Sequence, residues 1–128
     1  MTLKKISTII LVIAWVGMYV ATHIPMPTLP SYAPGDKHIH YVAYFFLTMI
    51  FIFTLKVHKV STLKVVILAL TIMPAYAAID ELTQPWVNRH CDFYDWFADV
   101  IGTITAVAAS LIFMVFPKNE SICSSKKE

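Results

Sequence analysis

Residues 97–116 read FADVIGTITAVAASLIFMVF, and this stretch indicates the class of protein to which the chain belongs. It holds one ionisable side chain, Asp99, and no proline. An apolar run of about 17–25 residues can cross a lipid bilayer as a helix, in which the backbone polar groups are satisfied internally. Residues 97–116 therefore predict a transmembrane helix with one acid near its start.

Three other stretches are similarly apolar, and they lie at Ile6–Ile24, Ile39–Leu55 and Thr62–Ile79. The chain of 128 residues is 58% hydrophobic and only 14% charged, with a mean hydropathy of +0.67. Soluble domains are about 45–50% apolar and about 25% charged. We predict an all-α polytopic membrane protein in which residues 1–128 form a single domain. Its four transmembrane helices are expected at about 6–24, 37–55, 62–84 and 93–116, followed by a basic tail at 117–128.

The first apolar stretch also resembles a secretory signal peptide, because Lys4 and Lys5 precede it. It is longer than the usual apolar region of such a peptide, and the residues after it lack a clean small-x-small cleavage site. Val20-Ala21-Thr22 is only a weak match. We expect the segment to be retained as the first helix.

The basic residues divide unequally between the two sides that four spans define. Eight of the ten Lys and Arg residues fall on one side, and only Lys37 and Arg89 fall on the other. Because basic loops stay in the cytoplasm, both termini are predicted to be cytoplasmic. The acids sort the opposite way, since six of eight lie on the outer side or at outer helix ends: Asp36, Asp80, Glu81, Asp92, Asp95 and Asp99.

Three polar clusters converge on the predicted outer face. They are Asp36-Lys37-x-x-His40-x-x-x-Tyr44, Asp80-Glu81-x-x-Gln84 and Arg89-x-x-Asp92-x-x-Asp95-x-x-x-Asp99-x-x-Gly102. Spacings of three and four place side chains on one face of a helix. We therefore predict that the clusters form one shared site, assembled from the outer ends of the second, third and fourth helices.

Asp99 is the most unusual member of these clusters because of its depth. It lies two helical turns beyond Asp92, which is about 10 Å at 1.5 Å per residue. A charged side chain that faces lipid at the bilayer centre costs about 2.5–3.5 kcal/mol, so Asp99 is expected to face the bundle, a cation, a proton or water. Gly102, just beneath it, is expected to let a neighbouring helix approach closely.

Several of these residues also have ordinary structural interpretations. Asp36 can cap the second helix, and Asp92 or Asp95 can cap the fourth. Cys91 is expected to be an exposed thiol rather than a metal ligand, and it cannot pair with Cys123, which falls on the opposite side. Glu81 and Asp99 are the residues least explained by such roles, because both adjoin apolar runs and neither is needed to end a helix.

The clusters together resemble the VanZ-like family, which is named for a teicoplanin-resistance protein. The resemblance rests on Asp36-Lys37, His40 and Tyr44, then Asp80-Glu81-x-x-Gln84, then Arg89, Asp95, Asp99 and Gly102, in that order. At the position of Asp99 the family usually has Asn. The resemblance implies a multi-pass protein of the bacterial cytoplasmic (inner) membrane, with the site facing the periplasm or exterior and a link to glycopeptide antibiotics.

From these residues we predict an envelope-facing enzyme or binding site for an anionic, lipid-linked or cell-wall-derived molecule. Lys37 and Arg89 would hold a phosphate or carboxylate group, with Gln84, Tyr44 and Asp80 beside them. Acid, base or other catalytic roles are assigned to Glu81, His40, Asp95 and Asp99. A divalent cation such as magnesium, calcium or manganese is a further expectation, with oxygen ligands from Asp92, Asp95, Asp99 and Glu81.

The competing hypothesis is a non-enzymatic accessory subunit or a proton- or ion-linked transport element. The cytoplasmic halves of the four helices are nearly free of ionisable groups, which argues against a path across the membrane. A third interpretation makes the charges a buried network that fixes the bundle. Membrane lipid is the expected partner, the oligomeric state stays open, and nothing in the sequence indicates nucleic-acid or nucleotide binding.

Overall fold

The computed structural model describes residues 1–24 and 34–115, with side chains described from 37 to 114 in the second range. These residues form four α-helices and a short 3₁₀ helix: α1 (Leu3–His23), α2 (Pro34–Val57), α3 (Thr62–Thr83), η1 (Gln84–Val87) and α4 (Phe93–Val115). All four α-helices are long and apolar enough to cross a membrane. The predicted all-helical fold with four candidate spans is confirmed.

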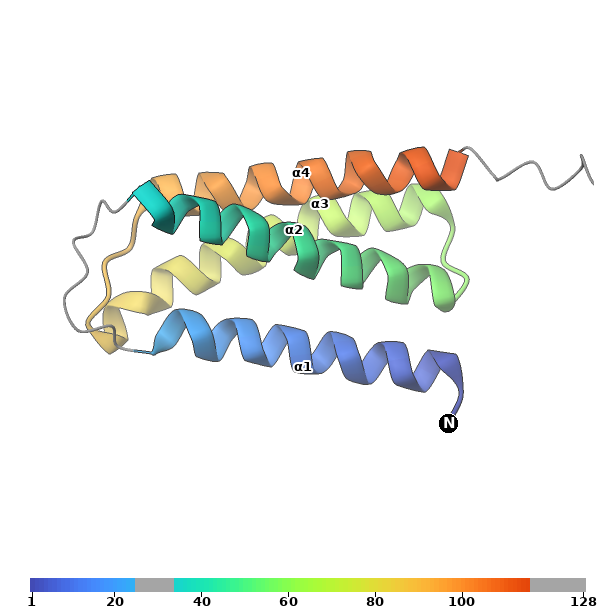
Figure 1. Cartoon of the computed structure of the whole chain (residues 1–128), viewed down its shortest axis with the longest axis horizontal. Helices are drawn as coiled ribbons and strands as arrows, with labels where there is room; N and C mark the ends of the chain where they lie inside the picture. The colour runs from blue at the N-terminus through green and yellow to red at the C-terminus, as the bar shows by residue number, and fades with distance from the viewer. Residues whose placement is uncertain (25–33, 116–128) are drawn as a thin grey trace, which may run out of the picture.

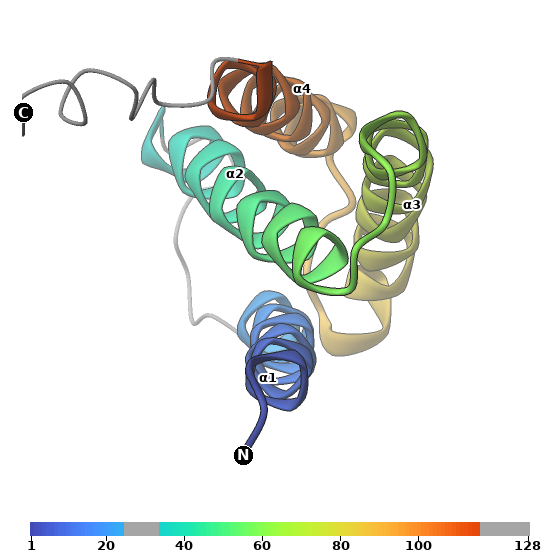
Figure 2. The same ribbon diagram turned by 90° about the vertical axis from the view of Figure 1, so that its right-hand side faces the viewer.

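The helices form a bundle in which α2 is the central element. It packs most extensively against α4, and it also contacts α1 and α3. Figure 2 shows α2 running obliquely between α4 on one side and α1 on the other. The turn between α2 and α3 is short, as expected for a helical hairpin.

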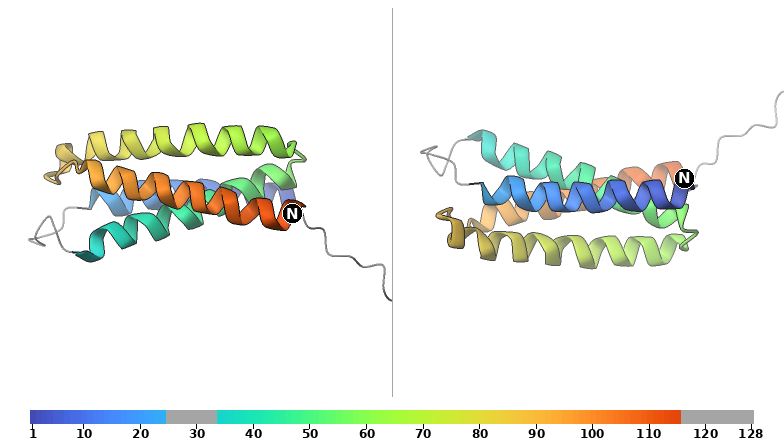
Figure 3. Two further views of the ribbon diagram at one scale, coloured as in Figure 1. Left: turned by 90° about the horizontal axis from the view of Figure 1, so that it is seen from above. Right: turned by 90° about the horizontal axis from the view of Figure 1, so that it is seen from below.

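One end of the bundle gathers the ends of five elements (Figure 1). These are the C-termini of α1 and α3, the N-termini of α2 and α4, and η1 between them. The two views of Figure 3 show the same grouping from opposite sides. All three polar clusters of the sequence lie on these helix ends, so we call this the acidic end.

Local sequence explains most helix boundaries near the acidic end. Helix α2 begins at Pro34, three residues before the predicted start, because proline suits the first position of a helix. Asp36 therefore lies inside the first turn of α2, and the predicted capping by its side chain falls outside the described side chains. Helix α3 ends at Thr83, one residue early, and Pro85 follows within η1.

Helix α4 begins at Phe93 and is capped by Asp92, one of the two predicted candidates. The Oδ1 atom of Asp92 accepts a hydrogen bond from the backbone N–H of Tyr94 at 2.8 Å, the contact expected of a residue just before a helix. Asp95 lies in the first turn of α4, and its carboxylate is free for other contacts. Residues 25–33 and the residues after Val115, which include the predicted basic tail at 117–128, lie outside the described residues.

Helix α4 approaches α2 closely at Gly102. A Cβ atom at this position would collide with the carbonyl oxygen of Tyr41 and lie 3.2 Å from the backbone nitrogen of Phe45, both on α2. The predicted close approach at Gly102 is thus confirmed, and α2 is the neighbour. One turn of α2 further along, the Thr48 hydroxyl donates to that of Thr103 at 3.3 Å.

Helix α3 is joined to its neighbours by two hydrogen bonds from aromatic side chains. Trp96 Nε1 donates to the carbonyl of Pro74 at 3.2 Å, which ties α4 to α3. The Tyr76 hydroxyl donates to the carbonyl of Trp15 at 3.1 Å, which ties α3 to α1. Helix α3 continues through Pro74. These contacts hold the C-terminal half of α3, and so its acids, against the rest of the bundle.

Candidate functional site

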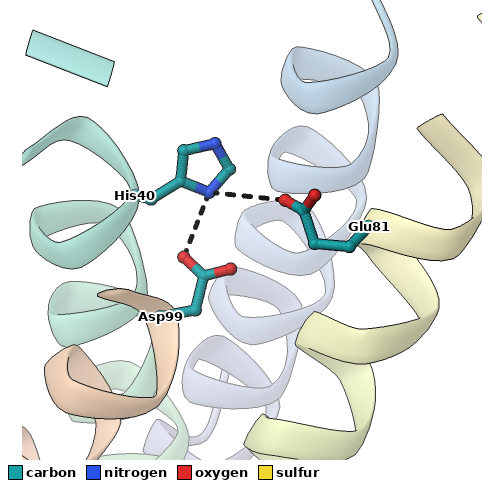
Figure 4. A group of neighbouring side chains, drawn as sticks. All are labelled: His40, Glu81 and Asp99. Atoms are coloured by element: carbon teal, nitrogen blue, oxygen red, sulfur yellow. Dashed lines mark hydrogen bonds and ion pairs between the residues drawn. The ribbon is translucent and has the colours of Figure 1, made fainter. Parts of the chain in front are cut away.

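Three ionisable side chains from three helices meet inside the acidic end. His40 of α2, Glu81 of α3 and Asp99 of α4 converge on one point (Figure 4). The Nδ1 atom of His40 lies 3.1 Å from Oδ1 of Asp99 and 3.9 Å from Oε1 of Glu81. Asp99 has no exposed surface, and Glu81 and His40 are only 2% and 6% exposed. The structure therefore brings together three residues to which the sequence assigned catalytic roles.

Glu81 is held in place through both of its carboxylate oxygens. Gln84 Nε2 donates to Oε1 at 3.0 Å, and the backbone N–H of Asp92 donates to Oε2 at 3.1 Å. Gln84 lies one turn after Glu81, so the spacing in the sequence already allowed the first contact. The second contact joins α3 to the start of α4. Together they orient the Glu81 carboxylate toward His40.

A second cluster, centred on Lys37, lies toward the surface from this trio. The Nζ atom of Lys37 donates to Asp92 Oδ2 at 3.0 Å and to Asp95 Oδ1 at 3.1 Å, and it lies 5.5 Å from the ring centre of Tyr94. Asp92 lies outside the candidate spans. Its pKa is lowered, first by the hydrogen bond from the Tyr94 N–H and then by Lys37. Lys37 is therefore already neutralised by two carboxylates.

Asp80 forms a third contact region, between α3 and α1. Its Oδ1 atom accepts a hydrogen bond from the Thr22 hydroxyl at 2.7 Å and lies 3.6 Å from Nδ1 of His23. His23 Nε2 also lies 2.9 Å from the Thr83 hydroxyl. The sequence pattern indicated no site role for α1. A Thr-His pair in the last turn of an otherwise apolar helix was the one signal that could have found it.

Three buried polar atoms at this end have no hydrogen-bond partner within the described part of the chain. They are the Tyr44 hydroxyl oxygen, Asp80 Oδ2 and Asp99 Oδ2. Tyr44 lies one turn after His40 on the same face of α2 and is fully buried. Buried polar groups are nearly always hydrogen-bonded, so these three atoms retain hydrogen-bonding capacity that the described side chains do not use.

Arg89 stands apart from the residues with which it was grouped. It is half-buried, and none of the ion pairs among the described side chains includes it. Its backbone N–H donates to the carbonyl of Gln84 at 3.2 Å, which closes the turn after α3. The two predicted anion-binding cations therefore differ, because Lys37 is paired with acids whereas the Arg89 guanidinium is left for other partners.

The predicted metal ligands are divided between two clusters. Glu81 and Asp99 lie together with His40, and one ligand atom from each of the three falls within 4.8 Å of the others. Asp92 and Asp95 instead contact Lys37. The structure thus groups a nitrogen ligand with two carboxylates, in place of the four oxygen ligands expected from the sequence.

At neutral pH the acidic end carries more carboxylates than Lys and Arg side chains. The described carboxylates are Asp80, Glu81, Asp92, Asp95 and Asp99, and the described basic groups are Lys37, Arg89 and the four histidines His23, His38, His40 and His90. Five acids therefore exceed the two permanently charged cations, and only protonation of the histidines would balance them. Such a set suits proton exchange or the binding of a cation.

No family model, curated protein or solved structure matches this chain. The resemblance to the VanZ-like family therefore stays a prediction based on the motifs. The chemistry of the site is inferred from its own geometry.

Proposed function

We propose that this chain is a VanZ-like protein of the bacterial cytoplasmic membrane, with both termini in the cytoplasm and the acidic end facing the periplasm or exterior. The distribution of Lys and Arg residues supports this orientation, since eight of ten lie on the side opposite the acidic end. The polar site then lies at the level of the lipid headgroups.

We infer that the site binds and acts on an anionic molecule that is lipid-linked or derived from the cell wall. The observation that carries this inference is the buried contact of His40 with Asp99 beside Glu81. An ionised Asp99 accepts the proton of Nδ1 and so leaves Nε2 free to take a proton from a bound molecule. In Figure 4 that second ring nitrogen lies on the far side of the imidazole from both carboxylates. Arg89 would hold the phosphate or carboxylate of the ligand.

A proton- or ion-linked transport element is the second candidate function. It is favoured by the buried hydroxyls of Tyr44, Thr48 and Thr103, which extend the polar interface of α2 and α4 below Asp99. Voltage-driven proton uptake into vesicles that contain the protein would support the transport function and argue against a site that acts only at the membrane surface. A lipid-dependent activity without such uptake would support the first proposal.

Binding of a phosphate-bearing lipid tests the proposed function directly. Native mass spectrometry of the purified chain should show undecaprenyl phosphate retained in preference to neutral undecaprenol. Arg89→Gln should weaken this retention at least tenfold, because a hydrogen bond to a charged group contributes about 1.5–3 kcal/mol. Lys64→Gln is the matched control, since Lys64 is exposed near the opposite end. Equal retention of both lipids, or equal loss in both variants, would contradict the proposal.

The proposed orientation predicts the accessibility of the two cysteines. Cys91 is a free, exposed thiol at the acidic end. In intact cells a membrane-impermeant maleimide should label the Cys123→Ala variant through Cys91, and it should not label the Cys91→Ala variant. Desolvation and the nearby Glu81 and Asp92 raise the pKa of the Cys91 thiol, so labelling should be faster in a mildly alkaline buffer. The reverse labelling pattern would place the acidic end in the cytoplasm.

A further inference from the structure

We propose that His40, Glu81 and Asp99 together bind one divalent cation of the zinc or manganese type. Each ligand comes from a different helix, so the ion would join α2, α3 and α4 at the acidic end (Figure 4). This metal site differs in its ligands from the set of Asp92, Asp95, Asp99 and Glu81 that the sequence suggested. It can be tested without knowledge of the ligand of the protein.

The distances among the three side chains fit a single ion. Ligand atoms bonded to one ion at roughly 2.0–2.2 Å lie about 2.8–4.4 Å apart, from right-angle to opposite positions. The separations of His40 Nδ1 from Asp99 Oδ1 and Glu81 Oε1 are 3.1 Å and 3.9 Å. Both values fall in this range, and one atom from each residue lies within 4.8 Å of the other two.

The chemistry of the ligand set selects the class of ion. Magnesium and calcium prefer sites made of oxygen ligands alone. An imidazole nitrogen suits zinc, and the two carboxylates also suit manganese. Two carboxylates and one neutral imidazole also balance the double charge of such an ion. The ion would reduce the excess of negative charge at the acidic end, where α2, α3 and α4 bury its three ligands together.

Contacts around the trio supply a second layer of support. Glu81 is oriented by Gln84 and by the backbone N–H of Asp92, as ligating carboxylates usually are. The buried Tyr44 hydroxyl has no partner within the described part of the chain, and neither has Asp99 Oδ2. Tyr44 lies one turn after His40, so the two side chains share one face of α2. A water molecule bound to the ion would give both unpartnered groups a hydrogen-bond partner.

Metal binding to the purified full-length chain tests the site. After treatment with a chelator, titration calorimetry in detergent should show one Zn²⁺ or Mn²⁺ bound per chain, at least tenfold more tightly than Mg²⁺ or Ca²⁺. Asp99→Asn, His40→Gln and Glu81→Gln should each weaken binding at least tenfold. Asp95→Asn is the matched control, because it makes the same charge change in the neighbouring Lys37 cluster and should leave affinity within twofold.

Two outcomes would overturn the metal site. One is the absence of stoichiometric binding to a chain whose circular dichroism and elution volume are those of a folded protein. The other is an equal loss of affinity in Asp95→Asn and Asp99→Asn, which would indicate non-specific attraction to the acidic end. Because Asp99→Asn can itself perturb folding, Glu81→Gln serves as the second variant, with thermal melting of each variant recorded beside its affinity.

The metal site also bears on the proposed function. This part of the inference rests on the proposed binding of an anionic lipid. With an ion on Nδ1, His40 would hold that ion in place of acting as a base, and the ion would supply positive charge for an anionic headgroup in a site where acids outnumber Lys and Arg residues. Undecaprenyl phosphate retention should then rise at least tenfold when Zn²⁺ or Mn²⁺ is added, and the rise should vanish in Glu81→Gln. Metal binding without this rise would still support the metal site, and it would contradict the proposed lipid function.

Discussion

Replacing Gly102 by alanine should lower the free energy of unfolding by about 1–3 kcal/mol, the usual range for overpacking a close contact. The added Cβ would meet the carbonyl oxygen of Tyr41. That oxygen belongs to the backbone of α2, so it cannot rotate away as a side chain can. Relief requires α2 and α4 to separate, and their interface is the most extensive in the described bundle.

Gly17→Ala is the matched control for this prediction. A Cβ at Gly17 meets nothing within 4 Å, so the substitution should be neutral or stabilising by up to about 1 kcal/mol through helix propensity. Unfolding of both variants by a denaturing detergent, followed by circular dichroism, measures the difference. Equal stability of the two variants would mean that α2 and α4 are not in contact at Gly102.

His40→Ala should lower the free energy of unfolding by about 3–5 kcal/mol, because removal of one member of a buried charge pair leaves the other charge uncompensated. Asp99 has no exposed surface, and its Oδ2 atom already lacks a partner among the described residues. Without His40, the carboxylate would have to take up a proton or draw water into the bundle. The loss should be smaller at low pH, where protonated Asp99 is neutral.

A double variant measures the interaction between His40 and Asp99 apart from the other contacts that each residue makes. His40→Leu with Asp99→Leu should be markedly more stable than the sum of the two single changes predicts, since replacing both charges by apolar groups is often neutral. Lys37→Gln is a control at the same end, and it should change stability by less than about 1 kcal/mol because the Lys37 side chain is 43% exposed. Additive effects of His40→Leu and Asp99→Leu would show that the two residues are not coupled.

A bound metal ion gives the stability experiment a second readout. Ligands that bind only the folded state raise its stability in proportion to the logarithm of their concentration. Addition of Zn²⁺ should therefore raise the melting temperature of the unsubstituted chain and leave that of Asp99→Asn unchanged. A similar rise in both proteins would indicate binding elsewhere on the chain.

Much of the fold follows from local features of the chain. Residues 97–116 and the other apolar stretches are long enough to span a bilayer, and each lies largely within a helix of the structure. The cap of α4 at Asp92 and the end of α3 just before Pro85 depend on neighbours along the chain. The alignment of His40 with Tyr44, and of Glu81 with Gln84, depends only on helical spacing. Such features are predictable because they involve residues within one or two turns of each other.

The partners of the site residues depend on how the helices are rotated and tilted against one another. The cluster spacings placed Asp92, Asp95 and Asp99 on one face at the start of α4. In the structure, however, Lys37 contacts the first two carboxylates and His40 contacts the third. Thr22 and His23 reach Asp80 because α1 ends beside α3 at the acidic end. These pairings arise from contacts between residues about 55–60 positions apart, and packing against Gly102 sets how closely α2 and α4 approach. Helical periodicity sets the face on which a side chain lies, whereas packing between helices selects the residue that it meets.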